Sequence, residues 1–286
     1  MRNMRALLTA AGASALIVAA AAGHDFWLIP DAFQLSPGET LQVRGQTSSS
    51  FPSSESAVAV DRIAEAVIID SRGRARIAEV TTASTALLLR HRPDAVGQYL
   101  VSTVIHPRSV RESAESFRRY LVLEGAPEIL ERLEREGAFP RDSITRRYAK
   151  YAKTVVEVGH GGRRSYGQVV GHPLEFLPMA DPEATRSGDT LRVQLLLDGR
   201  PLVNANAHMG SVVRPQGMSL DDLAGTERHL VLRTDSNGII ELVIDRDGIW
   251  NVRALHLEPA AAGSGADWET HWATLVFRVS STPPGA

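Results

Sequence analysis

Hydrophobic and polar positions alternate in short runs along most of this chain, and turn residues separate the runs. Leu41-Gln42-Val43 and Leu191-Arg192-Val193 show a period of two, which is typical of β-strands with one buried face. Asp198-Gly199, Asn237-Gly238 and Asp247-Gly248 mark tight turns between such runs. The pattern predicts a mainly β protein built from antiparallel β-sandwiches.

Two sequence signals recur with nearly the same spacing. Residues 36–43 (SPGETLQV) resemble residues 186–193 (RSGDTLRV), and residues 97–101 (GQYLV) resemble residues 248–252 (GIWNV). Such a repeat indicates two copies of one domain. We therefore expect two tandem Ig-like sandwiches, over residues 24–158 and 172–286, joined by a linker over residues 159–171 that is rich in Gly, Arg and Ser.

A segment of helical periodicity interrupts the first copy between residues 111 and 150. Phe117 and Leu121, and then Ile129 and Leu133, are spaced four apart, as on one face of a helix. Gly125-Ala126-Pro127 divides this run into two short helices, and a third helical piece is predicted over residues 144–150, before a strand over residues 154–158. This insertion is either a partner-docking element or a plug over a sheet edge, and we expect the plug, because sheet edges must be covered.

The first 23 residues have the features of a secretory signal peptide. Two arginines precede an apolar run over residues 6–22, and Ala21-Ala22-Gly23 supplies the small residues of a cleavage site. Cleavage after Gly23 makes His24 the first residue of the mature protein. Its amine and imidazole nitrogens then form a bidentate chelate for a transition metal. Cleavage one residue earlier leaves Gly23-His24, which also suits copper or nickel.

Composition narrows the functional classes. The 286-residue chain has no cysteine, which excludes disulfides, thiolate metal sites, cysteine nucleophiles and a lipoprotein anchor. Its net charge of −2 gives no electrostatic argument for a nucleic-acid partner. After the leader, no apolar run approaches the roughly 20 residues of a transmembrane helix. The pattern favours a periplasmic protein without a membrane span once the leader is cleaved.

Two internal histidines are candidates to complete a metal site with His24. His256 shares a strand face with Trp250, Val252 and Ala254, and His271 shares one with Ala273, Leu275 and Phe277. A hairpin between these strands brings both histidines together, near Asp267 and Glu269; Asp25, next to His24, is a further second-shell candidate. The alternative role for each histidine is a hydrogen-bonded packing residue at the edge of the core.

The other histidines have weaker signals. His106 falls one residue out of register with His256 in the first copy, so we expect it on the surface. The remaining five have no partner at a spacing such as His-x-x-x-His, and we expect them to be solvated or structural: His91, His160, His172, His208 and His229.

Four segments carry a resemblance to a known family: residues 24–28 (HDFWL), 148–154 (YAKYAKT), 173–178 (PLEFLP) and 267–274 (DWETHWAT). In these the chain resembles the periplasmic domain of unknown function 4198, a family grouped with nickel-uptake components. The resemblance implies an exported two-domain protein that binds nickel or cobalt and is accessory to a membrane metal-uptake transporter. It does not imply the permease itself, since this chain has no apolar span after its leader.

Two other classes remain open. A copper monooxygenase of the histidine-brace type also begins its mature chain with His and has a sandwich fold, so His24 with one internal histidine is compatible with copper chemistry. No nucleophile elbow, P-loop or paired-carboxylate motif is visible, and we do not expect an enzyme. The third class is a cell-envelope interaction module without a metal, because a sandwich carries no function by itself.

Overall fold

The computed structural model describes residues 24–124, 126–214, 218–219, 221–223 and 228–280. The predicted leader and its cleavage site, residues 1–23, lie outside the described residues. The described chain is mainly β, with two α-helices and three sheets. Within it, no helix is both long and apolar enough to cross a membrane.

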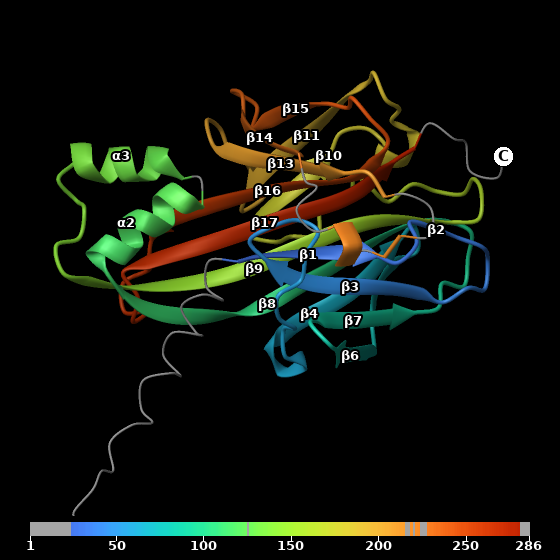
Figure 1. Ribbon diagram of the computed structural model, residues 1–286, viewed down its shortest axis with the longest axis horizontal. Helices are drawn as coiled ribbons and strands as arrows, with labels where there is room; N and C mark the ends of the chain where they lie inside the picture. The colour runs from blue at the N-terminus through green and yellow to red at the C-terminus, as the bar shows by residue number, and fades with distance from the viewer. Residues whose placement is uncertain (1–23, 125, 215–217, 220, 224–227, 281–286) are drawn as a thin grey trace, which may run out of the picture.

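One nine-stranded sheet runs through the whole molecule (Figure 1). Its central pair is β9 and β17, which are parallel, and the neighbouring strands pair antiparallel. β2 (Gln34–Leu35) also pairs with β9. The spatial order of the other strands is β14 (Arg228–Arg233), β13 (Asn206–Val212), β16 (Gly248–Pro259), β17 (Trp268–Val279), β9 (Ser143–Val158), β8 (Gly97–Ser113), β4 (Ile63–Asp70) and β5 (Gly73–Arg76).

Two four-stranded sheets cover this central sheet. The first contains β1 (Asp25–Pro30), β3 (Leu41–Ser48), β7 (Ala86–His91) and β6 (Glu79–Ala83). The second contains β10 (Leu174–Pro178), β11 (Thr190–Leu197), β12 (Arg200–Pro201) and β15 (Ile239–Val243). Short 3-10 helices occupy three connections: Val60–Arg62, Pro182–Ala184 and Asp221–Leu223.

The two covering sheets lie on opposite faces of the central sheet. Successive side chains of a strand point to opposite faces. In β9, Tyr151 belongs to the core under β10 and β11, whereas Ala152 belongs to the core under β1, β3 and β7. The two halves of the chain are thus joined by one continuous sheet, through the parallel pairing of β9 with β17. Residues 159–171, the predicted linker, contain no helix or strand.

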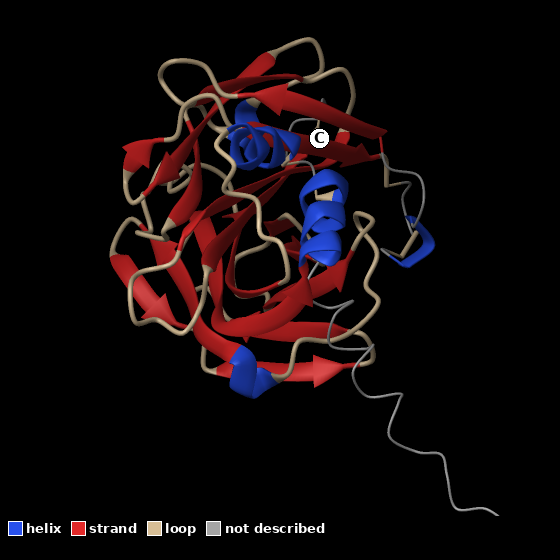
Figure 2. Ribbon diagram, turned by 90° about the vertical axis from the view of Figure 1, so that its left-hand side faces the viewer, coloured by secondary structure: helices blue, strands red, loops and turns tan. Residues whose placement is uncertain are grey.

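The insertion in the first half is shorter than predicted. It holds α2 (Ala114–Leu123) and α3 (Pro127–Arg135), between strands β8 and β9. Phe117, Leu121, Ile129 and Leu133 are buried, as their spacing predicts. They pack on side chains at the end of the β16–β17 hairpin, among them Trp268, so the helices cover a sheet face and not an edge. Figure 2 views the molecule from this end, with both helices in front of the strands.

The predicted helix over residues 144–150 is wrong, and so is the predicted start of the following strand at residue 154. Both segments belong to β9, which begins at Ser143. Ile144, Arg146 and Tyr148 are buried while the residues between them are partly exposed, which is a period of two. The pattern is hidden in the sequence because Arg146, a buried strand residue, is charged; Glu112 of β8 neutralises it at 2.9 Å.

Candidate metal centre on the β16–β17 hairpin

Strands β16 and β17 form a hairpin that places His256 directly opposite His271. Glu258 lies opposite Glu269. This pair is two residues nearer the hairpin loop than the histidine pair, and it is therefore on the same face of the sheet. Trp250, which is predicted to share this face of β16 with His256, lies in the core under β10 and β11. The hairpin therefore brings four side chains capable of binding metal to adjacent positions at the end of an apolar face.

The two imidazoles converge on one carboxylate. Nε2 of His271 is 3.4 Å from Oε1 of Glu258, and Nε2 of His256 is 3.8 Å from Oε2 of the same residue. The side chain of His271 is 10% exposed, that of His256 23% and that of Glu258 41%. The histidines are thus inside the rim of the site, and the carboxylate faces solvent.

The other ring nitrogen of His271 is also engaged. Its Nδ1 is 3.2 Å from the hydroxyl of Tyr151, and the two rings are stacked at 6.0 Å. Tyr151 stacks in turn on His172, whose Nε2 is 2.9 Å from the Ser102 hydroxyl. This arrangement holds the His271 ring from behind and orients Nε2 towards Glu258.

Burial lowers the pKa of His256, and the negative charge of Glu258 offsets part of this effect. The neighbouring His271 also lowers the pKa of His256. His256 is consequently held in the neutral form that ligates metals. Within the described residues, however, no group of three or more His, Asp or Glu side chains is already arranged as a metal cage.

The predicted second-shell residues have other partners. Glu269 pairs with Arg147 at 2.9 Å, and the Asp267 carboxylate accepts the backbone N–H of Thr145 at 2.6 Å. Asp25 is buried against Arg253, with the carboxylate 3.0 Å from the guanidinium. Asp267 and Asp25 therefore serve the fold, whereas Glu269 remains next to Glu258 on the hairpin face.

His24 lies on the opposite face of the hairpin. Thr274, whose side chain points away from the face of His271, donates a hydrogen bond to the carbonyl of Phe26 in β1. The His24 carbonyl accepts a hydrogen bond from Lys150. Nε2 of the His24 ring is 3.6 Å from the Glu55 carboxylate. The structure therefore does not bring His24 to the two internal histidines, because the sheet separates them.

Nδ1 of His24 is buried and has no hydrogen-bond partner among the described residues. Around it lies a layer of buried charges between β1, α2 and the sheet. Burial lowers the pKa of Lys150 to about 8 and raises that of Glu124 to about 7. Glu124 in turn lies 3.9 Å from the guanidinium of Arg253.

A second histidine pair was not predicted. Nδ1 of His208 is 2.9 Å from Nε2 of His229, on neighbouring strands β13 and β14. These residues are 21 apart in sequence, so only the strand register reveals the pair. Arg253 lies opposite His208 on β16, and its positive charge lowers the pKa of His229 after the larger effect of burial. A cation is therefore disfavoured at this pair. His106 is exposed, as predicted.

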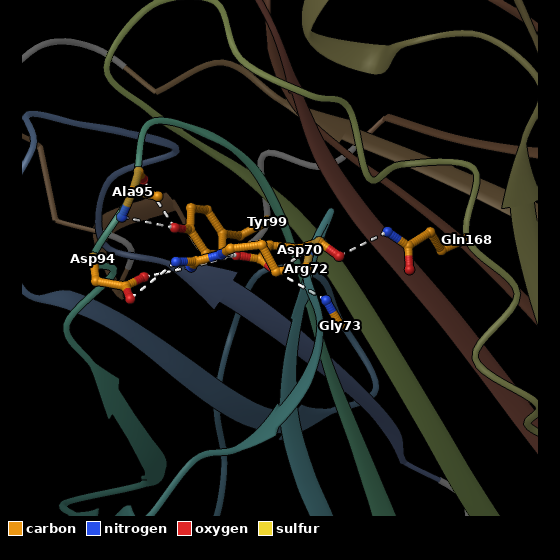
Figure 3. Close-up of polar contacts among 7 residues, drawn as sticks. All are labelled: Asp70, Arg72, Gly73, Asp94, Ala95, Tyr99 and Gln168. Carbon is orange, nitrogen blue, oxygen red and sulfur yellow. Dashed lines mark hydrogen bonds and ion pairs between the residues drawn. The ribbon is translucent and has the colours of Figure 1, made fainter.

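A pocket of about 440 Å³ lies around Asp70, Arg72 and Tyr99, and its lining includes none of the proposed metal ligands. Figure 3 shows the Arg72 guanidinium between Asp70 and Asp94. Its Nε donates to Oδ2 of Asp70 at 2.8 Å, and its Nη1 donates to Oδ2 of Asp94 at 3.0 Å. The Tyr99 hydroxyl donates to the carbonyl of Ala95 at 2.8 Å. The charge of Arg72 is offset by Asp70 and Asp94, and these contacts link the segments around the three residues.

Comparison with solved structures gives only remote likenesses. A DUF4785 family protein from Legionella pneumophila has 9% identity and a TM-score of 0.24, over 79% of this chain and 51% of that one. A Salmonella alpha-2-macroglobulin mutant has 11% identity and a TM-score of 0.23, over 89% and 15%. A two-domain fibronectin type-III segment of chicken tenascin has 14% identity and a TM-score of 0.19, over 88% and 97%. This chain thus spans about half the length of the first protein and a much smaller share of the second. Likenesses at this level do not bear on its function.

No curated protein matches this chain. A family model does match, over residues 21–258, and this range includes β1, both helices and His256. It covers most of the chain, including both halves of the fold. The chain therefore belongs to the family described as domain of unknown function (DUF4198).

Proposed function

We propose that this protein is an exported binding protein for a divalent transition metal ion, nickel or cobalt, and that it is accessory to uptake by a membrane transporter. The proposed ligands are His256, His271 and Glu258. The observation that carries the proposal is the convergence of both Nε2 atoms on one carboxylate. The grouping of the resembled family with nickel-uptake components favours nickel or cobalt, although imidazole and carboxylate also accept copper and zinc.

The spacing of the donor atoms supports this assignment. Two ligands at about 2.1 Å from an ion are about 3.4 Å apart when the ion is tetrahedral and about 3.0 Å apart when they are adjacent on a square-planar or octahedral ion such as nickel. Nε2 of His271 is 3.4 Å from Glu258 and Nε2 of His256 is 3.8 Å from it, so small side-chain rotations bring the donors to either spacing. Glu269, opposite Glu258, is close enough in register to add a fourth ligand if it leaves Arg147.

A competing site at His24 has one observation in its favour. Its buried Nδ1 lacks a hydrogen-bond partner among the described residues. If the leader is cleaved before His24, the new amine and Nδ1 form the bidentate chelate of a histidine brace. This second candidate is an N-terminal copper site with oxidative chemistry, and it is independent of the hairpin site.

One calorimetric titration of the processed full-length protein with Ni²⁺, Co²⁺, Cu²⁺ and Zn²⁺ separates the candidates. We expect His256→Ala and His271→Ala each to weaken nickel binding by about tenfold or more, because each removes a ligand. Glu258→Gln preserves the shape of the side chain, removes its charge and should also weaken binding.

His229→Ala is the matched control, because it removes a histidine from a pair that lies beside Arg253. It should leave nickel affinity unchanged, and so should His106→Ala. Loss of binding only in His24→Ala, together with copper-dependent peroxide production, would favour the brace. Equal affinity in all variants would rule out both candidate sites, and no binding of any ion would leave the interaction module as the better hypothesis.

We also propose that each half of the molecule is an Ig-like sandwich descended from one repeated unit. The spatial orders support this: outward from the central pair, β9, β8, β4 and β5 in the first half correspond to β17, β16, β13 and β14 in the second. Gly97 and Gly248, which are related by the sequence repeat, each begin the corresponding strand, with φ of +141° and +154°.

A further inference from the structure

A second pocket has a lining of one charge sign. It has a volume of about 210 Å³ and lies between the segment around Arg62 and the strands β8 and β9. Its polar lining consists of three cations and three hydroxyls, with no carboxylate: Arg62, Arg108, Lys150, Thr47, Ser56 and Tyr148. Lys150 and Tyr148 are buried, whereas Arg108 and Ser56 are exposed.

An irregularity in the strand pairing assembles this lining. Ile105 pairs with Lys150 and Arg108 pairs with Tyr148, so two residues of β8 lie opposite one residue of β9 between these pairs. This is a β-bulge, which changes the direction of the following side chains. Because of it, Ile105 and Arg108 line the same pocket although they are three residues apart.

Two buried polar atoms of the lining lack a protein partner. The hydroxyl of Thr47 and Nε of Arg62 are buried and form no hydrogen bond within the described residues. The side chain of Lys150 is only 4% exposed overall and donates to the His24 carbonyl. Unsatisfied buried donors beside cations are costly unless a ligand or water pairs with them.

The cations also repel one another. Burial lowers the pKa of Arg62; Tyr148 and Asp61 raise it, and the nearby charge of Arg108 lowers it. Asp25 and Glu124 offset the charge of Lys150, but both also face Arg253, which is 3.0 Å from Asp25. The pocket therefore retains an excess of positive charge.

We infer that this pocket binds a small oxyanion, such as phosphate, sulfate or a short carboxylate, between Arg62, Arg108 and Lys150. Oxygen atoms of the anion accept from the guanidinium groups and the ammonium, and the hydroxyls of Thr47 and Tyr148 fix its orientation. The site does not depend on the proposed metal function, because it lies on the other side of β9 from Tyr151 and His271.

The test is a calorimetric titration of the full chain with inorganic phosphate, sulfate or malonate, each at constant ionic strength set by chloride. We expect saturable binding of at least one of the three, and the comparison identifies phosphate, sulfate or carboxylate as the preferred chemistry. Arg108→Gln and Arg62→Gln should each weaken that binding by about tenfold or more, since each removes a charge-assisted hydrogen bond.

Arg200→Gln is the matched control, because Arg200 is exposed on β12 and does not line the pocket. It should leave anion binding unchanged, and melting temperatures should show that all three variants are folded. Wild-type affinity in both Arg108→Gln and Arg62→Gln would overturn the inference, and so would the absence of saturable binding for all three anions. Nickel affinity should be the same in Arg108→Gln as in the wild type.

Discussion

Single ionisable residues buried near the sheet set how stability depends on pH. Glu183 is 9% exposed and pairs with Arg278 at 3.2 Å, but one of its oxygens has no partner among the described residues. Burial outweighs the attraction of Arg278 and raises the pKa of Glu183 to about 7. In the unfolded chain the carboxyl has its ordinary pKa of 4.5. Between these two values the folded state binds more protons, so stability falls as pH rises.

Glu183→Gln should reduce this loss, because glutamine resembles the protonated carboxyl at every pH. We expect the wild type to lose on the order of 1–3 kcal/mol between pH 4.5 and 7 from this group, and the variant to lose less. Denaturant unfolding at pH 5 and pH 8 measures both. Glu241→Gln, at an exposed position of β15, is the control and should follow the wild type. Parallel pH profiles for wild type and Glu183→Gln would contradict the prediction.

At the same scale, sequence patterns located some residues of the two proposed sites and missed others. The period of two in β16 and β17 was sufficient to place His256 and His271 on one face with Trp250 and Phe277. Glu258 was missed, although it is two residues from His256 and therefore on the same face. Arg108 could not be predicted, because a β-bulge interrupts the period of two in β8 and a bulge has no clear signal in a single sequence.

At the scale of strands, tight backbone approaches depend on particular glycines. Gly248 begins β16 with a φ of +154°, and a Cβ there would lie 2.4 Å from the carbonyl oxygen of Val212 on β13. Gly73 has a similar φ of +142°, but a Cβ there meets nothing within 4 Å. The two positions separate backbone strain from steric overlap.

Gly73→Ala should cost about 1–2 kcal/mol through strain alone. Gly248→Ala should cost about 3 kcal/mol or more, because the added methyl also pushes β13 away from β16. Equilibrium unfolding in urea compares the two variants directly. Equal losses would show that the contact with Val212 adds nothing. The glycine itself was identified from the repeat, whereas its steric role follows from a neighbour more than 30 residues away.

Helical elements were easier to predict than their boundaries. The spacing of Phe117, Leu121, Ile129 and Leu133 marked both helices, because each buries one narrow stripe. The segment over residues 144–150 was misassigned, since its buried positions include Arg146 and Lys150, which a hydrophobic pattern does not count. The partners that make their burial tolerable, Glu112 and the His24 carbonyl, come from distant parts of the chain.

At the scale of the molecule, the main departure from prediction is the shared sheet. The repeat indicates two similar halves, but one sequence does not show that β9 and β17 pair with each other. Paired residues in these strands are 122 apart, such as Arg146 and Trp268. Nothing in the local pattern distinguishes a strand at an edge from one that joins the two halves of the chain.

This junction predicts cooperative unfolding of the whole molecule. Opening either half exposes the edge of β9 or β17 and the apolar faces on both sides of it. We expect one transition in differential scanning calorimetry, with equal calorimetric and van't Hoff enthalpies. Two separate transitions would show that the halves are independent and that the shared sheet contributes little to their coupling.

The same junction has a consequence for the order of folding. β17 is the last strand in the part of the chain that the structure describes. Until it is available, one edge of β9 keeps open backbone groups over residues 146–154, because β2 pairs only with Glu157 and Val158. Pairing partners that are far apart in sequence are brought together slowly, because a long loop must close first. During synthesis from the N-terminus, the first half therefore keeps an edge that can pair with other chains until the second half is nearly complete. During this interval the edge is open to pairing with other chains, which makes aggregation most probable before the second half has folded.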